Sequence, residues 1–222
     1  MENEKLNNAL TKIFVVALII LILTFSIGLP IYFRPFYYLH IDALSIPERT
    51  GLPKAEIKEA YNELLNYLTL PGVEFGVGVF HYSEEGKSHF EDCKALFTLN
   101  LVLGLISLAT VISLWILDKK GKIKLSRPEN HHISYTVCKR MLTTVIILAI
   151  LASINFTWTF ELFHKTIFMG KTNWGFAETL DPIILALPES FFRNCAILIV
   201  SSIVVICVSF IIYNKMKENR RD

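Results

Sequence analysis

Four long stretches without a charged side chain constrain the fold of this 222-residue chain more than any other feature. A helix needs about 20 apolar residues to cross about 30 Å of hydrocarbon, because each residue adds about 1.5 Å along the axis. Each stretch therefore predicts a transmembrane helix. The stretches are 13–33, 95–117, 141–160 and 195–213.

The composition agrees with a membrane protein and excludes several other classes. Hydrophobic residues make up 53% of the chain, and the mean hydropathy of +0.46 is too high for an ordinary soluble domain. The net charge of +2 gives no indication of nucleic-acid binding. The first stretch is too long for the apolar core of a cleaved signal peptide, and no small-x-small cleavage site follows it.

The distribution of lysine and arginine predicts the orientation in the membrane. Basic residues are dense in both terminal tails and in the segment 118–140, whereas segments 34–94 and 161–193 are richer in acidic residues. The positive-inside rule then places both termini and a loop over 118–140 in the cytoplasm. Two loops over 34–94 and 161–193 lie outside, and residues 1–222 form a single integral membrane domain.

The first outer loop contains periodic segments that predict structure of its own. Apolar residues in 54–68 recur at helical spacing, with charged residues on the other face, and Pro71-Gly72 follows. Segment 73–82 alternates with period two and predicts a short strand or extended segment. A further helix from Glu84 runs into the second span. The expected fold is an all-α membrane protein with four transmembrane helices and a small extracytoplasmic cap, which consists of the amphipathic helix and the extended segment.

Two histidines stand three residues from an acidic residue at the outer ends of predicted spans. His89 precedes Asp92, and His164 follows Glu161. Side chains three residues apart share a helix face, so each acid is expected to orient its histidine and favour its protonation. Asn100 and Asn155 are expected about one turn inside their spans, facing the bundle. Together these residues predict a polar pocket that opens to the outer leaflet.

Other interpretations of the same residues remain open. A histidine at a helix end is more often an interfacial anchor than a catalyst, and the two asparagines also suit bonds between helices. The two histidines and two acids also supply four candidate metal ligands. We expect no metal, because no further carboxylate-rich helix completes such a site. The four cysteines have no spacing that requires a bridge, so we expect free thiols.

Several short motifs, in this order and spacing, are similar to those of the lipoprotein intramolecular transacylases, a family of small bacterial membrane proteins. The resemblance extends over nearly the whole chain and includes the four-span layout. The motifs are His81-Tyr82 through His89 to Asp92, Phe163-His164 through Gly170 to Trp174, Asp181-Pro182, and Leu187-Pro188-Glu189 with Phe191-Phe192.

The resemblance implies an acyltransferase that acts on a bacterial lipoprotein whose N-terminal cysteine is diacylglyceryl-modified. The sn-2 acyl chain moves to the α-amino group of that cysteine, giving an N-acyl lyso-form. Donor and acceptor belong to one molecule, so no cofactor is expected, and the expected partners are this lipoprotein and membrane lipid.

The chemistry suits histidine, whose reference pKa lies near 6.5. We expect His89 and His164 to divide the transfer of the amine proton and stabilisation of the oxyanion, with Asp92 orienting His89. The sequence leaves open which histidine has which role. The residues expected to contact substrate in the outer leaflet are Tyr82, Asn100, Asn155, Glu161, Trp174, Glu189 and Phe192.

Two alternatives to an enzyme remain. A non-catalytic four-span module that binds lipid or lipoprotein would use the same pocket. A small transporter is less favoured, because the spans carry no charged residue and show no inverted repeat.

Overall fold

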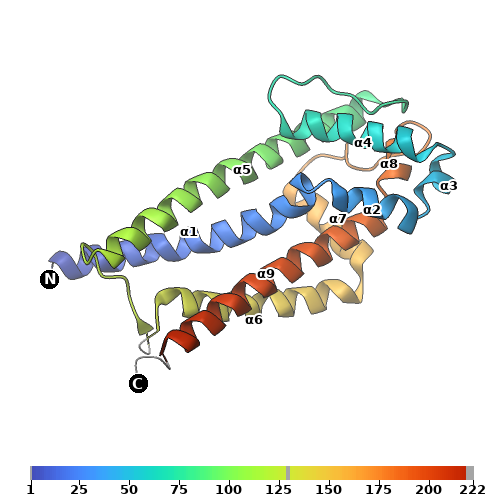
Figure 1. Ribbon diagram of the computed structural model, residues 1–222. Coiled ribbons are helices and arrows are strands. Elements are labelled where there is room, and N and C mark those ends of the chain that lie inside the picture. The colour runs from blue at the N-terminus through green and yellow to red at the C-terminus, as the bar shows by residue number, and fades with distance from the viewer. Residues whose placement is uncertain (1, 129–130, 219–222) are drawn as a thin grey trace. The chain divides into compact units, whose positions relative to one another are not determined.

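The computed structural model describes residues 2–128 and 131–218, and within these ranges all regular structure is helical (Figure 1). No strand is present in the described part, so the expected all-α fold is confirmed. The helices are α1 (Glu2–Tyr32), α2 (Pro35–Ala43), α3 (Ile46–Thr50), α4 (Lys54–Thr69), α5 (Glu84–Lys119), α6 (Ile133–Ile154), α7 (Phe156–Ile167), α8 (Ile183–Ala186) and α9 (Glu189–Glu218).

Helices α1, α5, α6 and α9 are long and apolar enough to cross a membrane. Between 6% and 33% of the residues in their most apolar windows are buried inside the protein. Large apolar side chains such as Leu105, Ile147 and Val205 are instead exposed, which in water would be a severe penalty. Hydrocarbon solvates these side chains, so the chain is a multi-pass membrane protein with four spanning helices.

The stretch 141–160 differs from the expected continuous helix. Helix α6 ends at Ile154, and Asn155 has an extended backbone with φ of −150° and ψ of 94°. The side chain of Asn155 then accepts a hydrogen bond from the N–H of Trp158 and caps the new helix α7. The helix long and apolar enough to cross a membrane here is Ile133–Ile154, and residues 156–160 belong to a separate helix.

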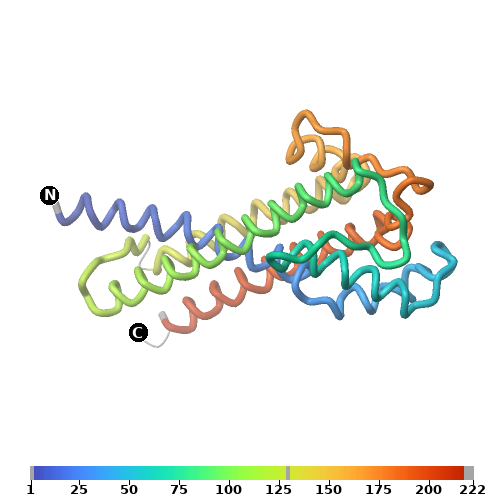
Figure 2. The backbone as a smooth tube through the Cα atoms, turned by 90° about the horizontal axis from the view of Figure 1, so that it is seen from above, coloured from blue at the N-terminus to red at the C-terminus, as the bar shows by residue number. Residues whose placement is uncertain are grey.

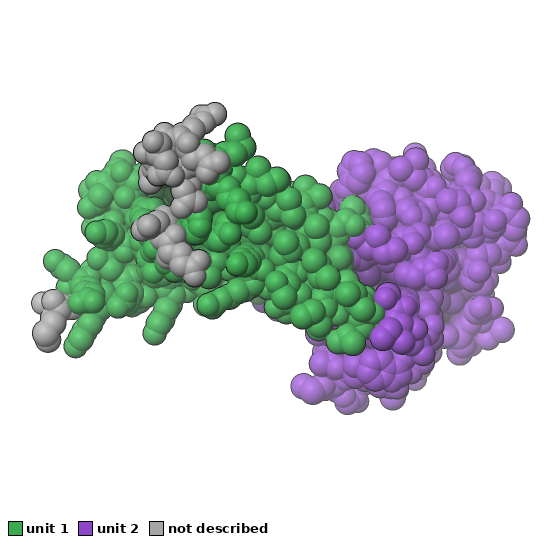
Figure 3. Space-filling model, turned by 90° about the horizontal axis from the view of Figure 1, so that it is seen from below, with its two compact units in different colours: residues 1–27, 100–151, 198–222 green, residues 28–99, 152–197 purple. Residues whose placement is uncertain are grey.

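The chain forms two compact units, which are coloured separately in Figure 3. The first comprises residues 1–27, 100–151 and 198–222. Its core joins α1, α5, α6 and α9 with the loop that follows α5. The core residues are Phe14, Leu18, Ile22, Leu114, Leu125, Val137, Cys138, Met141, Ile203 and Cys207.

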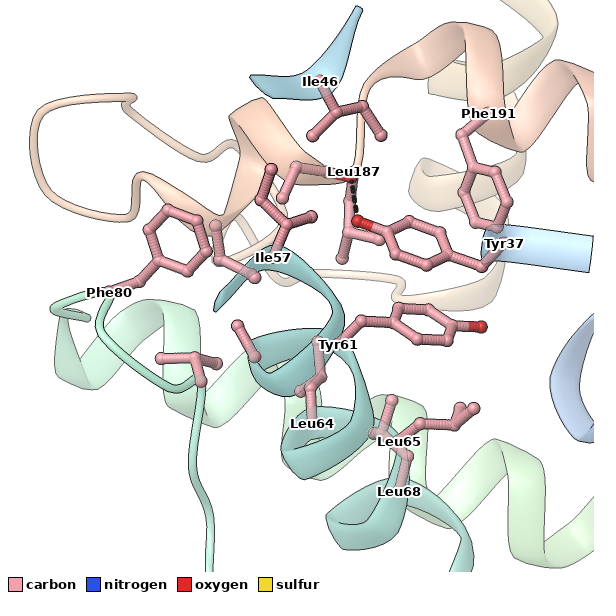
Figure 4. Packing of buried hydrophobic residues seen from close by; sticks show 14 of the residues in the cluster. Tyr37, Ile46, Ile57, Tyr61, Leu64, Leu65, Leu68, Phe80, Leu187 and Phe191 are labelled. Atoms are coloured by element: carbon pink, nitrogen blue, oxygen red, sulfur yellow. Dashed lines mark hydrogen bonds between the residues drawn. The ribbon is translucent and has the colours of Figure 1, made fainter. Parts of the chain in front are cut away.

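The second unit, residues 28–99 and 152–197, contains the candidate site. Its core is built on the apolar face of α4, which confirms the amphipathic helix expected over 54–68. Figure 4 shows Ile57, Tyr61, Leu64 and Leu68 of this face pointing into the cluster. The ring of Tyr61 stacks on Tyr37 of α2 with centroids 3.7 Å apart, and the Tyr37 hydroxyl donates a hydrogen bond of 2.8 Å to the carbonyl of Ala186.

Two segments of this unit, 70–83 and 168–182, are not helical (Figure 2). Segment 73–82, expected as a short strand or an extended segment, contains no strand, because it packs on α4 instead of pairing with another strand. The N–H of Gly78 donates a hydrogen bond of 2.7 Å to Glu63. Gly78 has a φ of +61°, and a Cβ there would lie 2.9 Å from the Cα of Ala60, so this close approach requires glycine.

Candidate active site

His89 lies in the charged first turns of α5, before the apolar segment that begins at Ala95. Its side chain is buried, with 5% of the residue exposed. Nε2 lies 3.4 Å from the Sγ atom of Cys93, one turn along the helix. Nδ1 is buried and has no hydrogen-bond partner among the described residues. With the Cys93 thiol as the donor of this contact, the ring proton belongs on Nδ1, which has no acceptor among the described residues.

His164 lies near the end of α7 and is half-buried. Its Nδ1 atom is 2.7 Å from the carbonyl oxygen of Phe160, one turn earlier. A carbonyl oxygen only accepts, so Nδ1 carries the proton and donates it. Nε2 is then left with a free lone pair, which is the state required of a proton acceptor.

The two imidazoles lie close together, although they come from segments of the sequence that are far apart. Their ring centroids are 6.0 Å apart. A hydrogen bond spans about 3 Å, so one reacting group can contact both rings. Phe168 touches both, with its centroid 4.9 Å from that of His89 and 5.8 Å from that of His164. Phe176 packs on His89, and Trp174 packs on His164.

Burial controls the protonation of His89. Desolvation is the main cause that lowers its pKa from 6.5 to about 4, and the nearby His164 lowers it further. The charge of Asp92 acts in the opposite direction but is a smaller effect. At neutral pH His89 is therefore an uncharged imidazole: Asp92 favours the protonated form, as expected, but burial outweighs its effect.

Asp92 binds the segment 168–182 and makes no hydrogen bond to His89. Its carboxylate accepts a bond of 2.5 Å from Nζ of Lys171 and one of 3.2 Å from the side-chain amide of Asn173. The bond from Lys171 holds the pKa of Asp92 below its usual range. The expected orienting hydrogen bond therefore does not form, and Asp92 instead ties the loop after α7 to α5.

Glu161 also differs from expectation. Its carboxylate lies 3.1 Å from Nζ of Lys165 on the exposed side of α7. The orienting partner of His164 is the main-chain carbonyl of Phe160, and Glu161 makes no hydrogen bond to this histidine. Each acid stands three residues from its histidine in the sequence, but each forms an ion pair with a lysine instead.

The two asparagines have separate structural roles. Asn100 belongs to the first unit, where its amide donates a bond of 3.2 Å from α5 to the carbonyl of Thr24 in α1. This matches the interpretation of a bond between helices. Asn155 is exposed and caps α7 through a bond of 3.0 Å from the N–H of Trp158. Asn155 was expected to face a pocket inside the bundle, but it is exposed and forms the N-cap of α7.

The other expected substrate contacts lie in the second unit at varying distances from the histidines. Trp174 is the one in ring contact, 5.3 Å from His164, and its indole N–H donates to the carbonyl of Lys171. Phe192 packs on Phe160, which itself touches His164. Glu189 accepts a bond of 2.8 Å from Thr157 and so links α9 to α7. Tyr82 is exposed and packs on Phe75.

A buried carboxylate that contacts the residue before α5 is not among the site residues predicted from the sequence. Asp181 is 4% exposed and accepts two hydrogen bonds from Ser83, one of 2.8 Å from the main-chain N–H and one of 2.7 Å from the hydroxyl. The Ser83 hydroxyl in turn accepts a bond of 2.9 Å from the N–H of Gly86. These contacts fix the first turn of the helix that carries His89. In the sequence, Asp181-Pro182 stands out only as one of the family-like motifs.

All four cysteines are free, as expected. Cys93 is the one beside a candidate catalytic group. Burial raises its pKa to about 12, so it remains a thiol near neutral pH. A thiolate nucleophile is therefore not available at this position in the resting protein.

Comparison with known proteins identifies the family. The family model described as lipoprotein intramolecular transacylase, Lit, matches residues 12–192. The membrane-integral transacylase Lit from Bacillus cereus has a similar solved structure, with 26% identity, coverage of 99% of this chain and 100% of that chain, and a TM-score of 0.84.

Two further structures of that protein carry a histidine replaced by arginine or by alanine. The arginine variant is 25% identical and the alanine variant 26%, each covering 99% of this chain, with 96% and 97% of the respective chain covered. Both have a TM-score of 0.79. No curated protein sequence matches the chain. The match over most of the length and the shared four-span fold show that this chain belongs to the lipoprotein intramolecular transacylase family and is a membrane-integral enzyme of that class.

Proposed function

We propose that this enzyme moves the sn-2 acyl chain of a diacylglyceryl-cysteine lipoprotein to the α-amino group of the same cysteine, with His164 as proton acceptor and His89 as hydrogen-bond donor. The observation that carries the proposal is the pair of imidazoles 6.0 Å apart, one with a free buried Nδ1 and one with its Nδ1 occupied. A histidine is also the residue that was replaced in the two variant structures of the Bacillus cereus protein, which supports a role for histidine in this family.

The reaction requires positioning and the movement of one proton from the amine to the sn-2 oxygen by way of His164. The amine nitrogen attacks the ester carbonyl, and its proton passes to Nε2 of His164. The oxyanion accepts a hydrogen bond from Nδ1 of His89. On collapse, the bond from carbon to the sn-2 oxygen breaks, and that oxygen takes the proton from His164. An ester and an amine become an alcohol and an amide, and no cofactor enters the balance.

The surroundings support this assignment. A reference α-amine pKa of about 7.7–8.0 leaves some neutral amine near pH 7. His89 remains neutral because burial lowers its pKa, so it does not repel the ammonium form of the substrate. Phe168, Phe176 and Trp174 form apolar walls around the histidines. Holding amine and ester together in such a site can supply about 7–11 kcal/mol.

An acyl-enzyme on Cys93 is the second candidate, because its Sγ lies 3.4 Å from Nε2 of His89. Burial of the thiol argues for direct attack by the amine, since its pKa of about 12 keeps it protonated. Trapping an acyl group on Cys93 by mass spectrometry would establish the covalent route instead.

Membrane orientation is part of the proposal. The basic tails and basic segment 118–140 support cytoplasmic termini, which puts the histidine pair at the outer leaflet. Lipoproteins carry their modified cysteine at that surface, so the substrate would meet the site without crossing the membrane.

The test is expression in a bacterial host without this activity, followed by mass spectrometry of a lipoprotein N-terminus. The wild type should yield N-acyl lyso-lipoprotein. His164→Ala and His89→Ala should each lower the rate about 100-fold or more. The exposed histidine His81, replaced by asparagine, serves as a matched control and should retain the rate. Unchanged rates in both alanine variants, correctly inserted, would refute the assignment of the histidines. Absence of the product with the wild type would favour a non-catalytic lipid- or lipoprotein-binding module.

A further inference from the structure

A seam of polar side chains links the start of α2 to α4 beside the hydrophobic core of the second unit; its residues are Arg34, Tyr38, Lys58, Asn62 and Asn66. Arg34, directly before α2, donates from Nη1 to Asn62 over 3.1 Å and from Nη2 to Asn66 over 2.6 Å. Tyr38 donates to the same Asn62 oxygen over 2.6 Å. Asn62 thus accepts two bonds, and the orientation of the guanidinium is fixed.

Neutral side chains hold this guanidinium, and among residues 2–128 and 131–218 no carboxylate forms an ion pair with it. The salt bridges of the described residues do not include Arg34. Arginine has five N–H donors, and these two bonds use one donor on each terminal nitrogen. A half-buried cation in this state retains strong attraction for an anion with several acceptor oxygens.

A second cation lies on the same seam. Nζ of Lys58 sits 4.2 Å from the ring centroid of Tyr38. Lys58, Asn62 and Asn66 follow one another at intervals of four residues on α4, so they share one face of that helix. The seam therefore presents two positive charges around Tyr38.

The position in the chain indicates the source of the anion. Arg34 comes directly after the first membrane-spanning segment, and the two residues before it are exposed aromatics, Tyr32 at 46% and Phe33 at 54%. Exposed aromatic side chains at the end of a span mark the headgroup level of a bilayer. Lipid phosphate is the abundant anion at that level, and its oxygens match the guanidinium fork.

We propose that Arg34, with Lys58, binds the phosphate of a phospholipid headgroup. The proposed substrate does not account for this site, because diacylglyceryl-cysteine has no phosphate and carries a cationic amine. The seam is thus a lipid site separate from the histidine pair, in a protein whose chemistry concerns a different lipid.

The experiment counts bound lipids by native mass spectrometry on protein delipidated in a phosphate-free maltoside detergent. The probes are phosphatidylglycerol, diacylglycerol with the same acyl chains, and inorganic phosphate. The affinity of the wild-type protein for phosphatidylglycerol should exceed that of the Arg34→Gln variant by about tenfold or more. Arg49→Gln removes an exposed arginine of the same unit and should bind like the wild type. Diacylglycerol should not distinguish wild type from Arg34→Gln.

A second variant guards against a fold defect in Arg34→Gln. Asn66→Asp supplies an internal carboxylate to the same guanidinium, which should preserve thermal stability while weakening phosphatidylglycerol binding about tenfold. Equal phosphatidylglycerol binding by the wild type and Asn66→Asp would overturn the proposal. So would equal affinity for diacylglycerol and phosphatidylglycerol. Displacement of the lipid by inorganic phosphate at equal concentration would also overturn it, since the ligand would then be a free anion.

Discussion

Replacing Asp181 by asparagine should loosen the start of α5 and displace His89. The carboxylate accepts two bonds from Ser83, of 2.8 and 2.7 Å, at a buried position. Bonds to a charged group contribute about 1.5–3 kcal/mol each, against about 0.5–1.5 for neutral ones. The variant also loses a negative charge at a helix N-terminus, worth about 0.3–1 kcal/mol. The expected total loss is about 2–4 kcal/mol.

Thermal unfolding in detergent micelles measures this effect. A loss of about 2–4 kcal/mol in a chain of this size corresponds to a fall in Tm of about 5–15 °C. The rate of lyso-lipoprotein formation should fall as well, because His89 lies on the loosened turns. Asp42→Asn is the matched control, since Asp42 is exposed and its ion pair with Lys54 is on the surface. That variant should change Tm by no more than about 2 °C.

Gly86 provides an independent check of the same contact. A Cβ at this position would lie 2.2 Å from Oδ1 of Asp181. Gly86→Ala should therefore push the carboxylate away, and the double variant should lose less stability than the sum of the two single variants. Strict additivity, or a Tm of Asp181→Asn equal to that of Asp42→Asn, would refute the reasoning.

Three further predictions follow from the site. Cys93→Ala should retain at least about half of wild-type activity, because the thiol stays protonated; loss of activity in a folded variant, measured by product mass spectrometry, would favour the covalent route. The free energy of unfolding should fall as the pH drops from 6.5 to about 4, because in this window the unfolded state protonates His89 and the folded state does not; His89→Gln should show a flatter dependence of Tm on pH, and an identical slope would contradict the burial effect. Asn155→Ala should cost about 0.5–2 kcal/mol through loss of the α7 cap, whereas Asn155→Asp should be nearly neutral in thermal unfolding; equal Tm values for both would show that the cap is not needed.

Features with a local signal were accessible from the sequence. The four spanning helices follow from uncharged runs, and α4 follows from a single apolar stripe, because burial in lipid or core imposes both patterns within one helix. The proximity of the histidines was predicted from their positions at the ends of two predicted spans, on the same predicted side of the membrane. Each of these inferences uses residues close together in the chain or a simple topological rule.

Features that depend on distant partners were not accessible. Asp92 meets Lys171, 79 residues away, and Ser83 meets Asp181, 98 residues away. Spacing within a helix brought an acid near each histidine but gave no information about these competing partners. The break at Asn155 was not predicted, because the residues on both sides of it are apolar and uncharged. Asparagine is nevertheless a preferred N-cap residue, since its side chain can accept a hydrogen bond from an N–H two or three residues later.

The most direct test of acyl transfer within one substrate molecule uses purified enzyme and a lipoprotein. In this lipoprotein the sn-2 acyl chain alone carries an isotope label. Excess unlabelled phospholipid supplies competing acyl chains. Our account predicts that the label appears undiluted on the cysteine amine of the same molecule, and that His164→Ala abolishes this product while leaving the substrate intact. Dilution of the label by unlabelled acyl chains, or label recovered on the enzyme itself, would contradict direct transfer within one substrate molecule.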